Sequence, residues 1–210
     1  MKIGRRSIRL GVVAVLIALL VFASRHAVLR TLGSLLVVED PLQPTEVAIV
    51  TSDAGWAGLI EAADLYREQH VVRIALPLVE SGRVGRELRR RGVEITSTIQ
   101  ILEQLGVPAT AVTNIGAGEG GTTDFTQAVA TWCATNGVKR LLVISAATHS
   151  RRIRRTLHRA FGNMPPQIVM RIPRHEAFDA ADWWLNRTTL RSGIFEIQKL
   201  LYDLVQHPVS

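Results

Sequence analysis

Several residues of this chain that could take part in chemistry directly follow one apolar segment. Residues 141–144 combine leucine with β-branched side chains, which is typical of a strand buried on both faces. Small residues then lead to His149, Arg151 and Arg152, where an amphipathic, arginine-rich helix begins. Ligands of α/β proteins bind where a parallel strand runs into a helix N-terminus, because free N–H groups and the helix dipole meet there. The pattern predicts a site for an anionic group and names no reaction.

His149 stands where a ligand-facing side chain would project, at the carboxyl end of that strand. An imidazole there suits acid–base chemistry near neutral pH. The alternative is a histidine at a helix start that only makes a local hydrogen bond. The helix arginines cannot all face one ligand, because successive residues turn by about 100°. We therefore expect most of them on a solvated face, or on one that meets anionic lipid head groups. They are Arg151, Arg154, Arg155 and Arg159.

A second candidate site is glycine-rich. Residues 116–121 match G-x-G-x-x-G between a predicted strand and a predicted helix. A dinucleotide fingerprint would follow the first strand and have an acidic residue about 20 positions on, and neither holds here. Two interpretations remain: a loop whose amides and Thr122 and Thr123 hydroxyls meet a phosphate, or a turn in which Thr or Asp caps the helix.

Carboxylates follow the first two predicted strands. Asp53 and Glu80 stand where catalytic groups project in a parallel sheet, and each could be a general base, a metal ligand or a turn residue. The six histidines lack the spacings of zinc sites, so we predict no metal centre, and the sequence leaves the cofactor unknown. Cys133 is the single cysteine and lies on an apolar helix face, which favours a buried structural thiol.

Strand and helix patterns alternate along the chain and predict one α/β domain. They indicate a three-layer, doubly wound, mostly parallel sheet of Rossmann-like type. A flexible linker is expected near 39–45 and a short strand at 92–95. The other predicted strands span 46–51, 71–76, 110–115, 140–145 and 168–172. The predicted helices span 56–69, 83–91, 96–105, 122–136, 150–161 and 180–205, the last with an interruption near Ser192 and Gly193.

The first 38 residues are predicted to be a separate membrane segment preceding a domain at 39–210. Residues 10–23 are an unbroken apolar run behind four basic residues. The positive-inside rule then predicts an N-terminal transmembrane helix of a single-pass inner-membrane protein, with a cytoplasmic N-terminus and a periplasmic domain. The run is shorter than the roughly 20 residues of a bilayer span, although residues 27–38 could extend it. A cleaved signal peptide or a cytosolic helix are the alternatives.

Charge excludes one class of partner. The net charge is +7, but six basic residues and no acidic ones lie in the first thirty positions. Removing those six from the 25 basic residues leaves 19 against 18 acidic residues, a net charge of +1. We therefore expect no nucleic-acid-binding face on the domain.

Several segments resemble one bacterial family in order and spacing. Residues 145–152 resemble the TS-x-x-H-x-x-R signature of the YdcF/SanA/ElyC-like family, and residues 46–50, 61–67, 106–108 and 121–124 resemble its other motifs. Trp183-Trp184 with Glu196, Lys199 and Tyr202 resembles its closing helix. The resemblance implies a cell-envelope protein that takes a phosphate-bearing or nucleotide-like ligand and supports envelope or peptidoglycan integrity.

The resemblance also assigns roles. It implies that Arg152, with Thr122 or Thr123, contacts the anion while His149 acts as acid or base. Glu80 completes our predicted ligand-binding set, and Asp53 is the second catalytic candidate. The expected partners are an anionic small molecule or lipid-linked phosphate, and the membrane.

Two loops depart from the family pattern. Residues 51–55 replace its glycine-rich turn, and residues 76–82 replace its small-residue turn after the second strand. These changes favour an alternative function, a catalytically inactive member that acts as an interaction or structural protein of the envelope.

Overall fold

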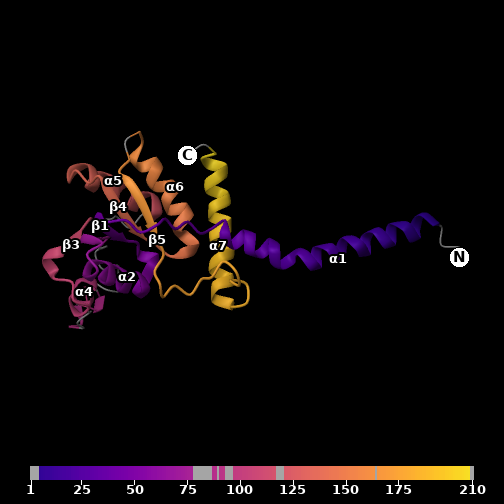
Figure 1. Ribbon diagram of the computed structural model, residues 1–210, viewed down its shortest axis with the longest axis horizontal. Coiled ribbons are helices and arrows are strands. Elements are labelled where there is room, and N and C mark those ends of the chain that lie inside the picture. Colours follow the sequence, from indigo (N-terminus) through magenta and orange to yellow (C-terminus); the bar gives the residue numbers. More distant parts are fainter. Residues whose placement is uncertain are drawn as a thin grey trace.

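The domain is built on a five-stranded, all-parallel sheet of order β3-β2-β1-β4-β5 (Figure 1). The computed structural model describes residues 5–77, 87–88, 90–92, 97–116, 121–163 and 165–208. The sheet and its helices confirm the predicted Rossmann-like α/β class. The strands are β1 (Thr45–Val50), β2 (Val71–Leu76), β3 (Val112–Asn114), β4 (Arg140–Ile144) and β5 (Gln167–Arg171).

Helices cover both faces of the sheet because each central strand carries apolar side chains on both sides. In β1, Ala48 and Val50 belong to the core on one face, whereas Val47 and Ile49 belong to the core on the other. The first core includes α2 (Gly55–Arg67) and α4 (Thr98–Gln104); the second includes α5 (Thr122–Thr135) and α6 (Ser150–Phe161).

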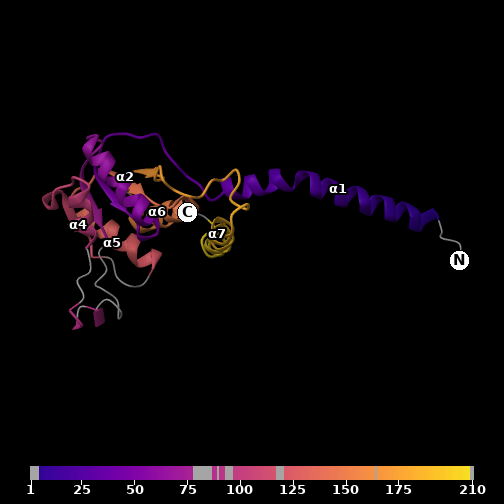
Figure 2. The ribbon, with the colours of Figure 1, turned by 90° about the horizontal axis from the view of Figure 1, so that it is seen from below.

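Two long helices complete the fold, α1 (Arg5–Ser34) and α7 (Arg187–Gln206). Figures 1 and 2 show α1 projecting from the domain, and α7 lies across the end of α1 that meets the domain. Helix α7 is seen from the side in Figure 1 and along its axis in Figure 2. Within the part of the chain that the structure describes, no helix combines the length and apolar character that crossing a membrane requires. The transmembrane anchor stays a prediction.

The prediction for the last helix was wrong at its start and in its interior. Helix α7 begins at Arg187 rather than near Ala180, where the preceding residues form turns. Asn186 sets this boundary, because its side chain caps the helix by accepting a hydrogen bond from the Thr188 amide at 2.8 Å. The helix also continues without a break through Gly193.

Trp183 explains why a glycine is needed inside α7. A Cβ atom on Gly193 would lie 2.5 Å from Trp183 Cε3, and one on Gly33 would lie 2.7 Å from Trp183 Cδ1. The buried indole therefore fits between two glycines, one on α1 and one on α7. Its Nε1 also donates to the Leu29 carbonyl at 2.8 Å, which joins α1 to the turns that precede α7.

The segment after α1 is fixed at its start, contrary to the flexible linker expected at 39–45. The Asp40 amide donates to the Met170 carbonyl at 3.0 Å, and the Asp40 carboxylate accepts from the Met170 amide at 2.9 Å. Arg154 pairs with the same carboxylate at 3.1 Å. Asp40 thus attaches the chain to the edge of β5 and to α6. The strand predicted at 92–95 and the helix predicted at 83–91 lie mainly outside the described residues.

Candidate functional site

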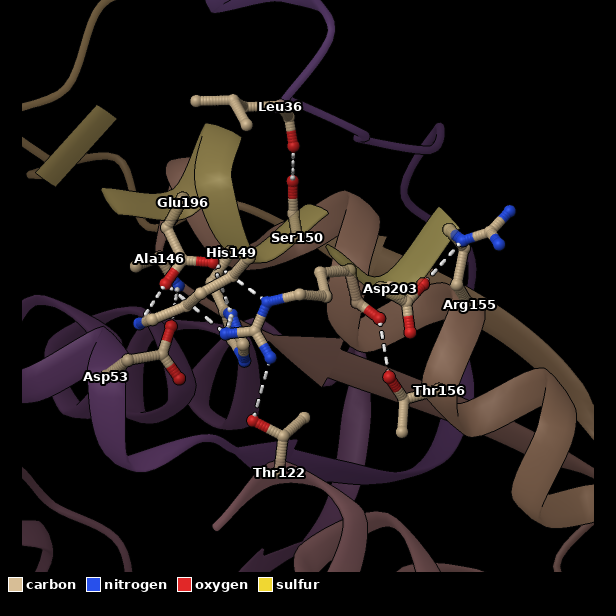
Figure 3. A network of polar contacts seen from close by, with 12 residues as sticks. Leu36, Asp53, Thr122, Ala146, His149, Ser150, Arg155, Thr156, Glu196 and Asp203 are labelled. Carbon is tan, nitrogen blue, oxygen red and sulfur yellow. Dashed lines mark hydrogen bonds and ion pairs between the residues drawn. The ribbon is translucent and has the colours of Figure 1, made fainter. Parts of the chain in front are cut away.

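The strand order reverses between β1 and β4, so their carboxyl ends border the crevice where open α/β sheets bind ligands. Asp53 bridges this point from the short helix η1 (Ser52–Ala54) that follows β1. Its Oδ2 accepts from the Ala146 amide at 3.1 Å (Figure 3). The same oxygen accepts from the Ser145 hydroxyl at 3.3 Å. The loops after the two strands are thereby joined at the predicted place.

Arg152, in the first turn of α6, connects the remaining polar groups. Its Nη1 donates to Thr122 Oγ1, at the start of α5, at 3.1 Å. Nε and Nη2 donate to the two carboxylate oxygens of Glu196, on α7, at 3.0 and 3.2 Å. Nη2 also lies 2.8 Å from Nδ1 of His149, which ends the short helix η3 (Ala147–His149). Side chains from α5, α6, α7 and the short helix η3 therefore meet at one guanidinium.

Glu196 is the buried counter-charge of this cluster. Burial tends to raise its pKa, but the contacts with His149, Arg152 and Lys199 outweigh that effect and hold the pKa of the carboxyl well below its usual range. Lys199 Nζ lies 2.6 Å from Glu196 Oε1, and its side chain is 56% exposed. Lys199 therefore places a positive charge at the solvent-facing rim of the cluster.

The neighbours of His149 restrict which ring nitrogen carries the proton. Nδ1 lies 2.8 Å from Arg152 Nη2 and 3.3 Å from Glu196 Oε2. Because a guanidinium can only donate, the shorter contact makes Nδ1 an acceptor and places the proton of the neutral ring on Nε2. If Arg152 moved away, Nδ1 could instead carry the proton and donate a hydrogen bond to Glu196. The contact with Arg152 thus favours one tautomer of the neutral ring.

The structure brings together three of the predicted site residues, His149, Arg152 and Thr122, and places Asp53 on the adjoining loop. Thr123 is exposed. The Thr126 hydroxyl donates to its carbonyl at 3.0 Å, so the main chain of Thr123, rather than its hydroxyl, makes this contact. Glu80 lies outside the described residues, as do positions 117–120 of the glycine-rich segment.

The other arginines of α6 are not the solvated face that we expected. Arg155 and Arg159 pair with Asp203 of α7, and Arg154 pairs with Asp40. All three are partly buried, because α6 is covered by α7 and by the segment after α1 in addition to the sheet. Burial works against ionisation of Asp203, yet the two arginines keep the pKa of this carboxyl below its ordinary value.

Glu196 and Lys199 were not among our predicted site residues. The resemblance placed both on its closing helix, but no local pattern connects that helix with the carboxyl edge of the sheet. Only tertiary packing of α7 against η3 and α6 brings the two side chains to Arg152.

A pocket of about 400 Å³ lies at the carboxyl ends of β1 and β2. Thr51, Ser52 and Gly55, which flank Asp53, line it together with Trp56. This volume is within the range of small-molecule sites, roughly 300–1,000 Å³. Trp56 is largely exposed and offers an aromatic surface at the pocket.

Neither a metal centre nor a reactive thiol is found in the described part of the chain. Among those residues, no group of three or more His, Cys, Asp or Glu side chains is arranged to hold a metal ion. Burial, with a smaller effect of Glu46, raises the pKa of the Cys133 thiol to about 12, which suits the predicted structural role.

The fold and the cluster define a Rossmann-like α/β protein with a polar site beside the β1/β4 crevice. Comparisons with protein-family models, curated proteins and solved structures find no match for this chain. The resemblance to the YdcF/SanA/ElyC-like family rests on the sequence motifs alone.

Proposed function

We propose that this chain is a cell-envelope protein of the YdcF/SanA/ElyC-like kind that binds a phosphate-bearing or nucleotide-like ligand, including a lipid-linked phosphate, and supports envelope integrity. The observation that carries the proposal is the contact of Arg152 with His149, Thr122 and Glu196 at the carboxyl edge of the sheet. An arginine fork beside two helix N-termini is suited to phosphate oxygens.

The ligand would join the cluster through groups that are not fully committed. Lys199 is half exposed, and the N-terminus of α5 at Thr122 adds backbone donors. The pocket beside Asp53 and Trp56 would take the remaining part of the ligand. A phosphate that draws Arg152 toward itself would free His149 Nδ1 to take up a proton from solvent and donate a hydrogen bond to Glu196. The proton on Nε2 would then be available for transfer to the ligand, with His149 as the general acid.

The proposed site of action is the inner-membrane surface, with the domain in the periplasm. The apolar run at 10–23 behind a basic flank supports this placement. So does the outer surface of α1, because a helix with this much exposed apolar surface needs a cover of lipid or protein. Its exposed large apolar residues include Val13, Val15, Leu16, Leu19, Leu20 and Phe22.

One observation favours the second candidate, a non-catalytic envelope protein. Glu196 already neutralises Arg152 and makes two hydrogen bonds to it, so the pair could serve only to fasten α7 to α6. In that case, the chain would act through its surface rather than through a ligand at Arg152.

A thermal-shift screen of the full chain in detergent separates these functions. Phosphate, nucleotides and polyprenyl phosphates are the probes, and at least one should raise the melting temperature of the wild type. Thr122→Ala and His149→Ala should abolish that shift while remaining folded. Arg191→Gln, an exposed arginine on α7, is the control and should keep it. No shift with any probe would contradict ligand binding.

Catalysis is tested separately. In a deletion strain with an envelope defect, His149→Ala should fail to restore growth if the site is an enzyme. Full restoration by this variant would favour the non-catalytic function.

A further inference from the structure

A second concave surface lies away from the cluster at Arg152. A groove of about 510 Å³ runs between the end of α1, helix α6 and the C-terminal half of α7. Its floor is apolar and includes Leu36, Leu201 and Leu204. His149, Arg152, Thr122 and Glu196 do not line it, so the groove is not part of the proposed phosphate site.

The rim of the groove is basic. Arg151, Arg154 and Arg155 line it, together with His158 and no acidic residue. Arg154 and Arg155 pair with Asp40 and Asp203, but Arg151 donates only to the main-chain carbonyls of Leu35 and Val37. Among the residues that the structure describes, no carboxylate pairs with Arg151. The described lining of the groove therefore carries one arginine, Arg151, whose charge is not neutralised by any described carboxylate.

The groove is continuous with exposed apolar surface. Leu201 lines it and is 58% exposed, and Val205, one turn further along α7, is 76% exposed. On the other side, Leu35 at the end of α1 lines the groove and is also exposed. Figures 1 and 2 place this junction at the base of α1, where that helix leaves the domain.

We propose that this groove binds one hydrocarbon chain of an anionic phospholipid from the bilayer, whose head-group phosphate contacts Arg151. An apolar floor matches the chain, and a basic rim matches the phosphate but not a zwitterionic or uncharged head group. The inference rests on the proposed membrane location, because the base of α1 would then lie at the lipid surface. It adds a lipid site that is independent of the ligand at Arg152.

Photolabelling tests the proposal. The full chain would be reconstituted in bicelles with a trace of phosphatidylglycerol or phosphatidylcholine carrying a diazirine on one acyl chain, and labelled peptides would be identified by mass spectrometry. We expect label on residues 32–38 and 197–204. The anionic probe should label them about 5-fold more than the zwitterionic probe, which is the ratio expected when roughly one arginine or lysine attracts an anionic lipid.

Matched variants identify the groove and its charge. Leu204→Trp fills the groove and should remove the label from residues 197–204, whereas Val205→Trp, outside the lining, should leave it. Arg151→Gln should abolish the preference for the anionic probe. Because Arg151 also holds the end of α1, Arg151→Lys, which keeps the charge, should retain the preference if the charge is what matters.

Three outcomes would overturn the inference: label confined to α1, equal labelling by both probes, or crosslinks through the groove to a second copy of the chain. Its failure is distinguishable from failure of the proposed function. Bicelle labelling tests the groove alone. The phosphate screen with Thr122→Ala tests the ligand site, and a separate fractionation of cells into membrane and soluble protein would test the membrane location.

Discussion

Glu196 determines how the polar cluster is charged. Its carboxylate accepts from Arg152 and Lys199 and faces His149, and the residue is 8% exposed. Without this carboxylate, Arg152 would be a mostly buried cation, and among the described residues its remaining hydrogen-bond acceptors would be Thr122 and the imidazole. A single side chain on α7 therefore makes it possible to place an arginine and a histidine in contact.

Because folding lowers the pKa of Glu196, its ionised form stabilises the folded state. That contribution is complete above the unfolded value of 4.5 and is lost as pH falls below it. We predict that Glu196→Gln lowers the free energy of unfolding by about 2 kcal/mol at neutral pH. Urea unfolding between pH 3 and 7 would measure this.

The variant should also lose less stability than the wild type as pH falls from 5 to 3, so that the two curves converge. Glu103→Gln, at an exposed position of α4, is the control and should change neither the midpoint nor its pH dependence. Parallel curves for Glu196→Gln and the wild type would contradict the prediction.

At the scale of elements, the sequence predicted the strands well because buried parallel strands have a simple pattern. Residues 71–76 match β2 at both ends, whereas β3 is shorter than the predicted 110–115 because a 3-10 turn, Ala109–Ala111, occupies its start. The start of α7 was predicted too early because the apolar residues around Trp183 look like part of the helix. They instead form turns, in which the indole of Trp183 packs between α1 and α7.

The same reasoning explains which site residues were predictable. His149, Thr122 and Asp53 each follow a different strand, and parallel strands bring such residues to one edge. Glu196 follows no strand directly, so no rule of topology places it there. Its position depends on how α7 packs, which one sequence does not reveal.

A charge in β4 should unfold the domain. Val143 is 1% exposed, lies opposite Ile49 in β1 and Met170 in β5, and offers no partner to a carboxylate. We predict that Val143→Asp costs at least about 3 kcal/mol. Val72→Asp is the matched control, because Val72 in β2 is 69% exposed and should lose no more than about 1 kcal/mol. Similar melting temperatures for the two variants would show that β4 is not a central strand.

At the scale of the whole molecule, charge and apolar surface are separated along the chain. The basic excess lies in the first thirty residues, and exposed apolar side chains follow along α1. We predict that alkaline phosphatase fused after Ser210 is active and that a cytoplasmic reporter at the same place is inactive. The opposite pattern would contradict the periplasmic location of the domain.

The placement of Trp183 between Gly33 and Gly193 makes the effect of a mutation depend on its background. Alanine is normally favoured over glycine inside a helix by about 1 kcal/mol, so Gly193→Ala should stabilise α7 unless it collides with the indole. We predict that this substitution destabilises the wild type but stabilises a Trp183→Leu variant, a case of sign epistasis that a double-mutant cycle would measure. The tryptophan and its two glycines would then be inherited together, since a change in any one of them alters what the other positions tolerate.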